Sequence, residues 1–241
     1  MGMEGSAREM LAAGTEATHE AAFRDGPYED ARALLEAALQ RAQADGDRAT
    51  EAGALDQLGW LLHFRTLDGD LDGAEPEAER SLFERALAIR RELGDLAGTA
   101  ASLFGIGLVH QVLRRDWDAA MPCFREALAL ADEHANALVR SECHRHVGFY
   151  FMVEDVRPEE ALRHLRISLE LREQWGDPRW VPSGTLALGQ AELVAGMRAE
   201  GIEHIRQAVQ QSREAGLSPR RIQSAEDWLR RAEAGETPGS R

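Results

Sequence analysis

The segment Leu58-Gly59-Trp60 is the first of four short segments in which a glycine follows an apolar residue in similar surroundings. The other three segments are Ile106-Gly107-Leu108, Val147-Gly148-Phe149 and Leu188-Gly189-Gln190. The last three glycines are spaced 41 residues apart, and the first precedes the second by 48 residues. Similarity at a fixed period is the signature of a repeat protein. We therefore expect stacked repeats of about 41 residues.

A second marker recurs at the same intervals and separates each repeat from the next. Its four copies are Gly46-Asp47, Gly94-Asp95, Ala135-Asn136 and Gly176-Asp177. Between these markers the apolar residues recur at helical spacing in two segments per repeat, and no run alternates as a strand does. Gly or Asn is expected to end the second helix because both residues enter the left-handed region readily. The sequence thus predicts an all-α fold.

Small residues occupy matching positions in the two helices of each repeat. Gly107 in the first helix, with Ala120 and Ala127 in the second, lets the two backbones approach closely. The equivalent positions are Gly148 with Ala161 and Ser168, and Gly189 with Gly201 and Ala208. Four large residues are expected to fill the gaps between them: Phe83, Phe124, Leu165 and Ile205. The first repeat lacks the glycine and has His19 in its place.

This pattern resembles the tetratricopeptide repeat, with Leu-Gly on the first helix and Ala, a large residue and Ala on the second. The period exceeds the usual ~34 residues, so the chain looks similar to the longer-helix variant of large bacterial regulators. The resemblance implies an all-α, right-handed α-solenoid of about five helical hairpins with a C-terminal capping helix. We expect one domain over residues 1–234, with repeats at about 8–47, 48–95, 96–136, 137–177 and 178–217. The cap would be 218–234, followed by a disordered tail at 235–241.

Composition and charge exclude several classes of function. Asp and Glu number 42 against 28 Lys and Arg, and the resulting net charge of −14 repels nucleic-acid phosphates and anionic membrane surfaces. No apolar run approaches the ~18 residues of a membrane-spanning helix, and the N-terminus lacks the layout of a signal peptide. Cys123 and Cys143 are too few for a disulfide framework. We expect a cytoplasmic protein with neither nucleic-acid nor membrane partners.

One stripe of the first helices is expected to line a concave groove, as the resemblance implies. At about 100° per residue, the positions three before and one, four and five after each glycine share this stripe. Its candidate ligand-binding members are Trp60, Phe64, Phe104, Leu108, Gln111, Phe149, Met152 and Gln190. Such a groove could receive an amphipathic helix or an apolar ligand. The competing interpretation is that these side chains pack on one another, since aromatic stripes belong more often to a core.

An enzyme is the alternative if the same groove closes into a pocket. Five residues would then supply acid–base or cation chemistry: Asp56, His63, His110, Arg145 and His146. The spacing argues against a metal centre, because His144 and His146 point to different faces of a helix. Glu16-Ala-Thr-His19 is the one Glu-x-x-His segment, whereas a di-iron bundle needs two. No cofactor is expected, since no dinucleotide-binding loop or Walker lysine is present.

The segment Asp68-Gly-Asp70-Leu-Asp72-Gly73, followed by Glu79, satisfies the formal pattern of a calcium loop. Glu75 stands where an apolar residue is usual, and Pro76 follows it. An acidic solvated loop is therefore the preferred interpretation.

The preferred functional hypothesis is a protein-interaction module that presents an apolar, aromatic groove to a partner peptide or helix. The alternative is a protein that binds an apolar small molecule, or an enzyme, using the same groove. Association of two copies into a homodimer through the ends of the solenoid is a third alternative.

Overall fold

A computed structural model describes residues 5–69 and 74–238 of the chain, and these residues contain helices and no strand. They fall into two compact units, Met1–Ala135 and Asn136–Arg241. The first unit contains the helices α1 (Ala7–Arg24), α2 (Tyr28–Asp45), α3 (Arg48–Leu67), α4 (Pro76–Leu93), α5 (Leu96–Leu108) and α6 (Trp117–His134). The second contains α7 (Ala137–Val153), α8 (Pro158–Trp175), α9 (Val181–Val194), α10 (Arg198–Glu214) and α11 (Pro219–Glu233).

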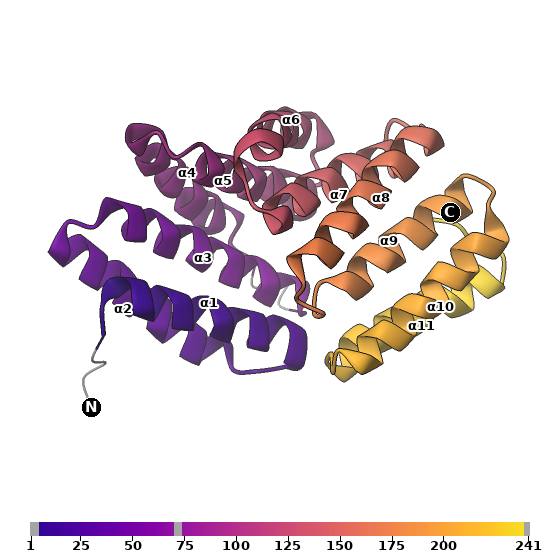
Figure 1. The fold of residues 1–241 in the computed structure, drawn as a ribbon, viewed down its shortest axis with the longest axis horizontal. Helices are drawn as coiled ribbons and strands as arrows, with labels where there is room; N and C mark the ends of the chain where they lie inside the picture. The colour runs from indigo at the N-terminus through magenta and orange to yellow at the C-terminus, as the bar shows by residue number, and fades with distance from the viewer. Residues whose placement is uncertain (1–4, 70–73, 239–241) are drawn as a thin grey trace. The chain divides into compact units, whose positions relative to one another are not determined.

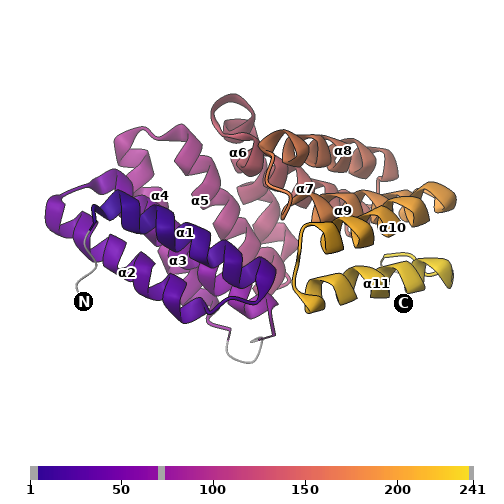
Figure 2. The same cartoon turned by 60° about the horizontal axis from the view of Figure 1, so that its bottom comes forward.

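Successive helices pack as pairs within each unit. In the first unit α1 packs on α2, α3 on α4 and α5 on α6, and the first helices also contact one another, α1 with α3 and α3 with α5 (Figure 1). In the second unit α7 packs on α8, α9 on α10, and α10 on α11 (Figure 2). The predicted all-α fold of about five hairpins and a C-terminal helix is confirmed. That residues 1–234 form one domain stays a prediction, and the end of the predicted tail, 239–241, lies outside the described residues.

The recurring marker pairs end one helix and start the next. Gly46 ends α2 with φ of 69°, a left-handed conformation that favours glycine, and Gly94 ends α4 in the same way. The carboxylate of Asp47 then accepts a hydrogen bond from the Thr50 amide and caps α3. Asn136 does not take the predicted left-handed conformation. Its φ is −71°, and its side chain caps α7 instead.

The predicted large residues lie directly on glycines of the first helices. A Cβ atom added to Gly59 would lie 2.7 Å from Cζ of Phe83, a fully buried side chain of α4 that also lies against Gly105 of α5. The other predicted contacts are Phe124 on Gly107, Leu165 on Gly148, and Ile205 on Gly189. A side chain at any of these positions would hold the paired helices apart.

The first repeat follows the same rule at a position that the sequence comparison missed. A Cβ on Gly14 would lie 2.7 Å from Cδ2 of Leu35, which is fully buried on α2. The first repeat therefore makes an equivalent glycine contact, although His19 stands at the position that glycine holds in the other repeats. Gly14 lies five residues before His19, so alignment by the repeat period did not indicate it.

Helix α5 is more apolar than the sequence analysis allowed. The segment Leu96–Leu113 is 18 residues long with a mean hydropathy of 1.5, so by length and composition it could cross a membrane. The statement that no such stretch exists is thus wrong. Since 56% of the segment is buried inside the protein, its character is that of a core helix. Its last turn, Val109–Leu113, is π-helical (η1), which periodicity alone did not indicate.

The contact of Phe83 with glycine can be tested by adding a methyl group to α3. Gly59→Ala should lower the free energy of unfolding by about 1–3 kcal/mol, because the ring is held between two helices and cannot move away. Urea unfolding of the full chain, followed by circular dichroism, measures this loss.

Gly53→Ala is the matched control on the same helix. Its Cβ would also lie 2.7 Å from another atom, but that atom is the end of the flexible Leu11 side chain. Removing a helical glycine favours the helix by up to ~1 kcal/mol, so this variant should be neutral or stabilised. Equal losses in the two variants would contradict the packing argument.

Candidate functional site

Five aromatic side chains of the first unit form a continuous series of ring contacts, which we call the aromatic row: Phe23, Phe64, Trp60, Phe104 and Phe124. The indole of Trp60 on α3 stacks on Phe104 of α5, with centroids 5.9 Å apart and an interplanar angle of 24°. It also lies 5.3 Å from Phe64. Trp60 is half-buried, whereas the other four rings are buried. The aromatic row therefore has one partly exposed indole, which packs against buried aromatic rings.

The remaining predicted groove residues of the first unit divide by burial. Leu108 is 1% exposed and belongs to the core, as do Phe64 and Phe104 of the aromatic row. Gln111 lies in the π-helical turn and is half-buried. Trp60 and Gln111 are thus the predicted groove members of this unit that solvent reaches.

The second unit contains the other predicted groove residues. Phe149 on α7 is half-buried and lies beneath the guanidinium of Arg145, whose central carbon is 4.5 Å from the ring centroid. His146 meets the same ring edge-on at 5.5 Å. Met152 and Gln190 are buried, at 6% and 8% exposure. Here Arg145 and Phe149 are the groove members that remain partly exposed.

The candidate acid Asp56 belongs to a buried ion pair that joins three helices of the first unit. Its Oδ1 accepts a hydrogen bond from Nη1 of Arg90 on α4 at 2.6 Å and another from Ser102 on α5 at 3.1 Å. The same Arg90 nitrogen donates to the Gly98 carbonyl at 2.9 Å. Asp56 is 3% exposed. These contacts give it a structural role.

The two candidate histidines of the first unit have separate surroundings. His63 is buried, and its Nδ1 lies 2.9 Å from Oε1 of Glu79, which is 1% exposed. His110 lies in the π-helical turn, where its Nδ1 is buried without a hydrogen-bond partner among the described residues. Burial, followed by the charge of Arg114, lowers the pKa of His110 and so favours its neutral ring. No hydrogen bond among the described residues joins Asp56, His63 and His110 to one another.

The calcium-loop residues are separated in the same way. Asp68 accepts a hydrogen bond from the hydroxyl of Tyr28, and Glu79 faces His63. Asp70 and Asp72 lie outside the described residues. Within the described ranges no three His, Cys, Asp or Glu side chains gather as metal ligands would.

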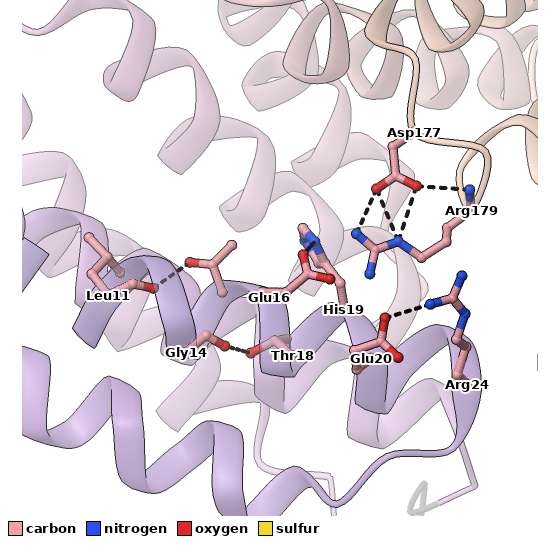
Figure 3. Close-up of polar contacts among 10 residues, drawn as sticks. Leu11, Gly14, Glu16, Thr18, His19, Glu20, Arg24, Asp177 and Arg179 are labelled. Atoms are coloured by element: carbon pink, nitrogen blue, oxygen red, sulfur yellow. Dashed lines mark hydrogen bonds and ion pairs between the residues drawn. The ribbon is translucent and has the colours of Figure 1, made fainter. Parts of the chain in front are cut away.

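Other polar residues singled out by sequence make local contacts. Figure 3 shows Glu16 and His19 on α1, with the Glu16 Oε2 4.0 Å from the His19 Nδ1. It also shows Asp177, which accepts hydrogen bonds from the backbone and side chain of Arg179 in the second unit.

Sequence analysis missed a second buried ion pair, which lies in the second unit. Arg172 on α8 is 1% exposed and donates to Glu142 on α7, to the Trp180 carbonyl at 2.7 Å and to Ser183. It corresponds to Arg90, since the two arginines are two repeat periods apart and each donates to a carbonyl eight residues further on. An arginine recurring near the end of a second helix was the available signal.

The buried pair of Asp56 and Arg90 predicts a large effect on stability. Asp56→Ala should lower the free energy of unfolding by about 3–5 kcal/mol, because it leaves the Arg90 guanidinium buried and uncompensated. Urea unfolding measures the loss, and adding Arg90→Met to the variant should restore part of it. Glu126→Ala is the control, since its pair with Arg91 is exposed and should contribute less than ~1 kcal/mol. A small loss for Asp56→Ala would contradict its structural role.

The comparisons with known proteins bear on the family and the fold. Residues 77–133, which span α4 to α6, match the tetratricopeptide repeat family. No curated protein matches the chain. Among solved structures, the crystal structure of BtubC (BKLC) from P. vanneervenii is similar with a TM-score of 0.55 and 18% sequence identity. That similarity covers 99% of this chain and 96% of the other, and it shows the fold alone.

The kinship with longer-repeat regulators stays a prediction. The family match and the paired helices agree with the repeat that the sequence pattern indicated. Residues 77–133 are therefore similar to the tetratricopeptide repeat, and the paired helices of both units are consistent with an α-solenoid of this kind.

Proposed function

We propose that this protein is an interaction scaffold that binds a peptide or helix of a partner protein at the partly exposed indole of Trp60. Tetratricopeptide repeats generally mediate interactions between proteins, which supports the general class. The position of the binding surface rests on the aromatic row.

The single observation that carries the proposal is the environment of Trp60. The indole is half-buried and stacked on buried Phe104, with the Phe64 ring 5.3 Å away and the His63 ring edge-on at 5.9 Å. His63 is itself held by Glu79. An aromatic ring fixed in this way loses little conformational entropy when a partner covers it. Tryptophan is also the residue type most enriched among binding hot spots.

The polar residues of the first unit support a scaffold more than an enzyme. Asp56 and His63, the candidates for acid–base work, are each engaged by a buried partner. Catalytic groups need access to a substrate within hydrogen-bond reach. The buried contacts of Asp56 and His63 instead join helices, so they favour rigid display of a surface.

A truncation of the indole tests the proposal. Trp60→Ala should weaken binding by ~2 kcal/mol or more, which is the usual size of a hot spot and corresponds to roughly 30-fold in Kd. The tagged full chain would be used to capture proteins from a lysate of the source cells, with quantitative mass spectrometry. A captured protein would then be titrated against both variants by calorimetry.

Trp175→Ala is the matched control, because Trp175 is a 42% exposed indole at the end of α8, outside the aromatic row. It should leave capture unchanged. Trp60→Ala should also cost less unfolding free energy than the ~3–5 kcal/mol of a fully buried aromatic residue. A loss of that full size, with capture unaffected, would show that Trp60 serves the core and would overturn the proposal.

A further inference from the structure

Arg145 on α7 is a partly buried cation that forms no ion pair within the described part of the chain. Three other arginines of low exposure are paired: Arg90 with Asp56, Arg172 with Glu142 and Arg179 with Asp177. Among the described residues, no carboxylate forms an ion pair with Arg145. The chain carries 42 acidic residues against 28 basic ones, so acidic partners are not scarce. The unpaired state of Arg145 therefore needs a specific explanation.

The guanidinium of Arg145 is held in place by neighbours that are not acidic. Its central carbon lies 4.5 Å from the Phe149 ring centroid, and its Nη1 donates to Nε2 of His146 at 3.4 Å. Its Nε is buried and has no hydrogen-bond partner within the described part of the chain. Stacking on an aromatic face does not itself use the donors at the edge of the planar guanidinium, so this contact leaves them free to bind an anion.

The surrounding charges make this position electropositive. Burial, followed by the charge of Arg172, lowers the pKa of Arg145 to about 10, and Arg221 on α11 acts in the same direction. Glu142 is the one carboxylate that opposes this shift, and Arg172 already donates a hydrogen bond to it. Removing a charge from water without a partner is costly. The free protein therefore carries a cost at Arg145 that an anion would offset.

We infer that Arg145, with Phe149 beneath it and His146 beside it, is a binding site for the carboxylate or phosphate group of a small anionic ligand. The planar guanidinium matches either group through two parallel hydrogen bonds. This inference goes beyond the proposed scaffold function, since it concerns the second unit and requires no partner protein. The two proposals can fail independently, because Trp60→Ala should leave anion binding at Arg145 intact.

Calorimetry of the full chain with two probes tests the site. Inorganic phosphate and succinate would each be titrated at constant ionic strength, with sodium chloride as the balancing salt. At least one probe should bind with a stoichiometry near one, and the better probe identifies the class of ligand. Arg145→Gln should weaken that binding at least tenfold, and Arg145→Lys, which lacks the planar fork, should weaken it less.

The matched control is Arg163→Gln, which removes an exposed arginine that pairs with Glu160 on the same helix, α8. This variant should bind the probe as the unchanged protein does. Binding of neither probe at millimolar concentration would overturn the inference. Equal binding by Arg145→Gln would also overturn it, because the anion would then associate elsewhere.

A second measurement needs no ligand. Urea unfolding of Arg145→Met should give a midpoint equal to or higher than that of the unchanged protein, because the variant removes a charge that nothing compensates. Arg172→Met should lower the midpoint clearly, since it leaves Glu142 buried without its partner. If Arg145→Met lowers the midpoint as much as Arg172→Met does, Arg145 is a structural residue and the inference is wrong.

Discussion

One large apolar side chain lying directly on a glycine of the first helix closes each helix pair, and the rest of the structure depends on this contact. Phe83 makes the contact twice, on Gly59 of its own pair and on Gly105 of the next. The ring therefore sets the distance within one pair and between two successive pairs. Because interiors are close-packed, a methyl group at either glycine has no free space to enter. A fixed helix separation, repeated along each unit, is what makes its surface rigid.

Buried ion pairs also join successive helix pairs, in addition to the apolar contacts on the glycines. Arg90 and Arg172 hold equivalent positions two repeats apart, and each joins the end of a second helix to the start of the following first helix. In the repeat between them the equivalent residue is Ala131, which is fully buried. A buried pair is not in itself stronger than an apolar contact, but it tolerates the loss of neither partner. Because the ion pairs occur in the second and fourth repeats, the loss of one charged partner should be most damaging there.

The sequence predicted the fold well because its periodic signals report backbone packing directly. The repeat glycines and the large residues on them were readable from one chain. The exceptions are Gly14, which lies five residues before the expected position, and Asn136, which caps α7 instead of ending α6 in a left-handed conformation. The candidate site was harder to predict. The position of a residue on the stripe of a first helix does not show whether its side chain is buried, as Phe104 is. Nor does the sequence show which carboxylate pairs with Arg90, because both features depend on residues distant in sequence. Asp56 was chosen as a catalytic candidate for the same features that suit an ion pair.

The two units differ in how completely their polar groups are satisfied, and this difference bears on function. In the first unit Asp56 and His63 each have a buried partner, and what remains partly open on the stripe is the indole of Trp60. In the second unit Arg172 donates a hydrogen bond to Glu142. Arg145, on the same helix as Glu142, instead stacks on the Phe149 ring and donates to His146. Burying a guanidinium without an ion pair costs free energy that an apolar side chain of similar size would not cost. A bound anion would offset this cost, because a guanidinium offers hydrogen-bond donors and a positive charge but no acceptor.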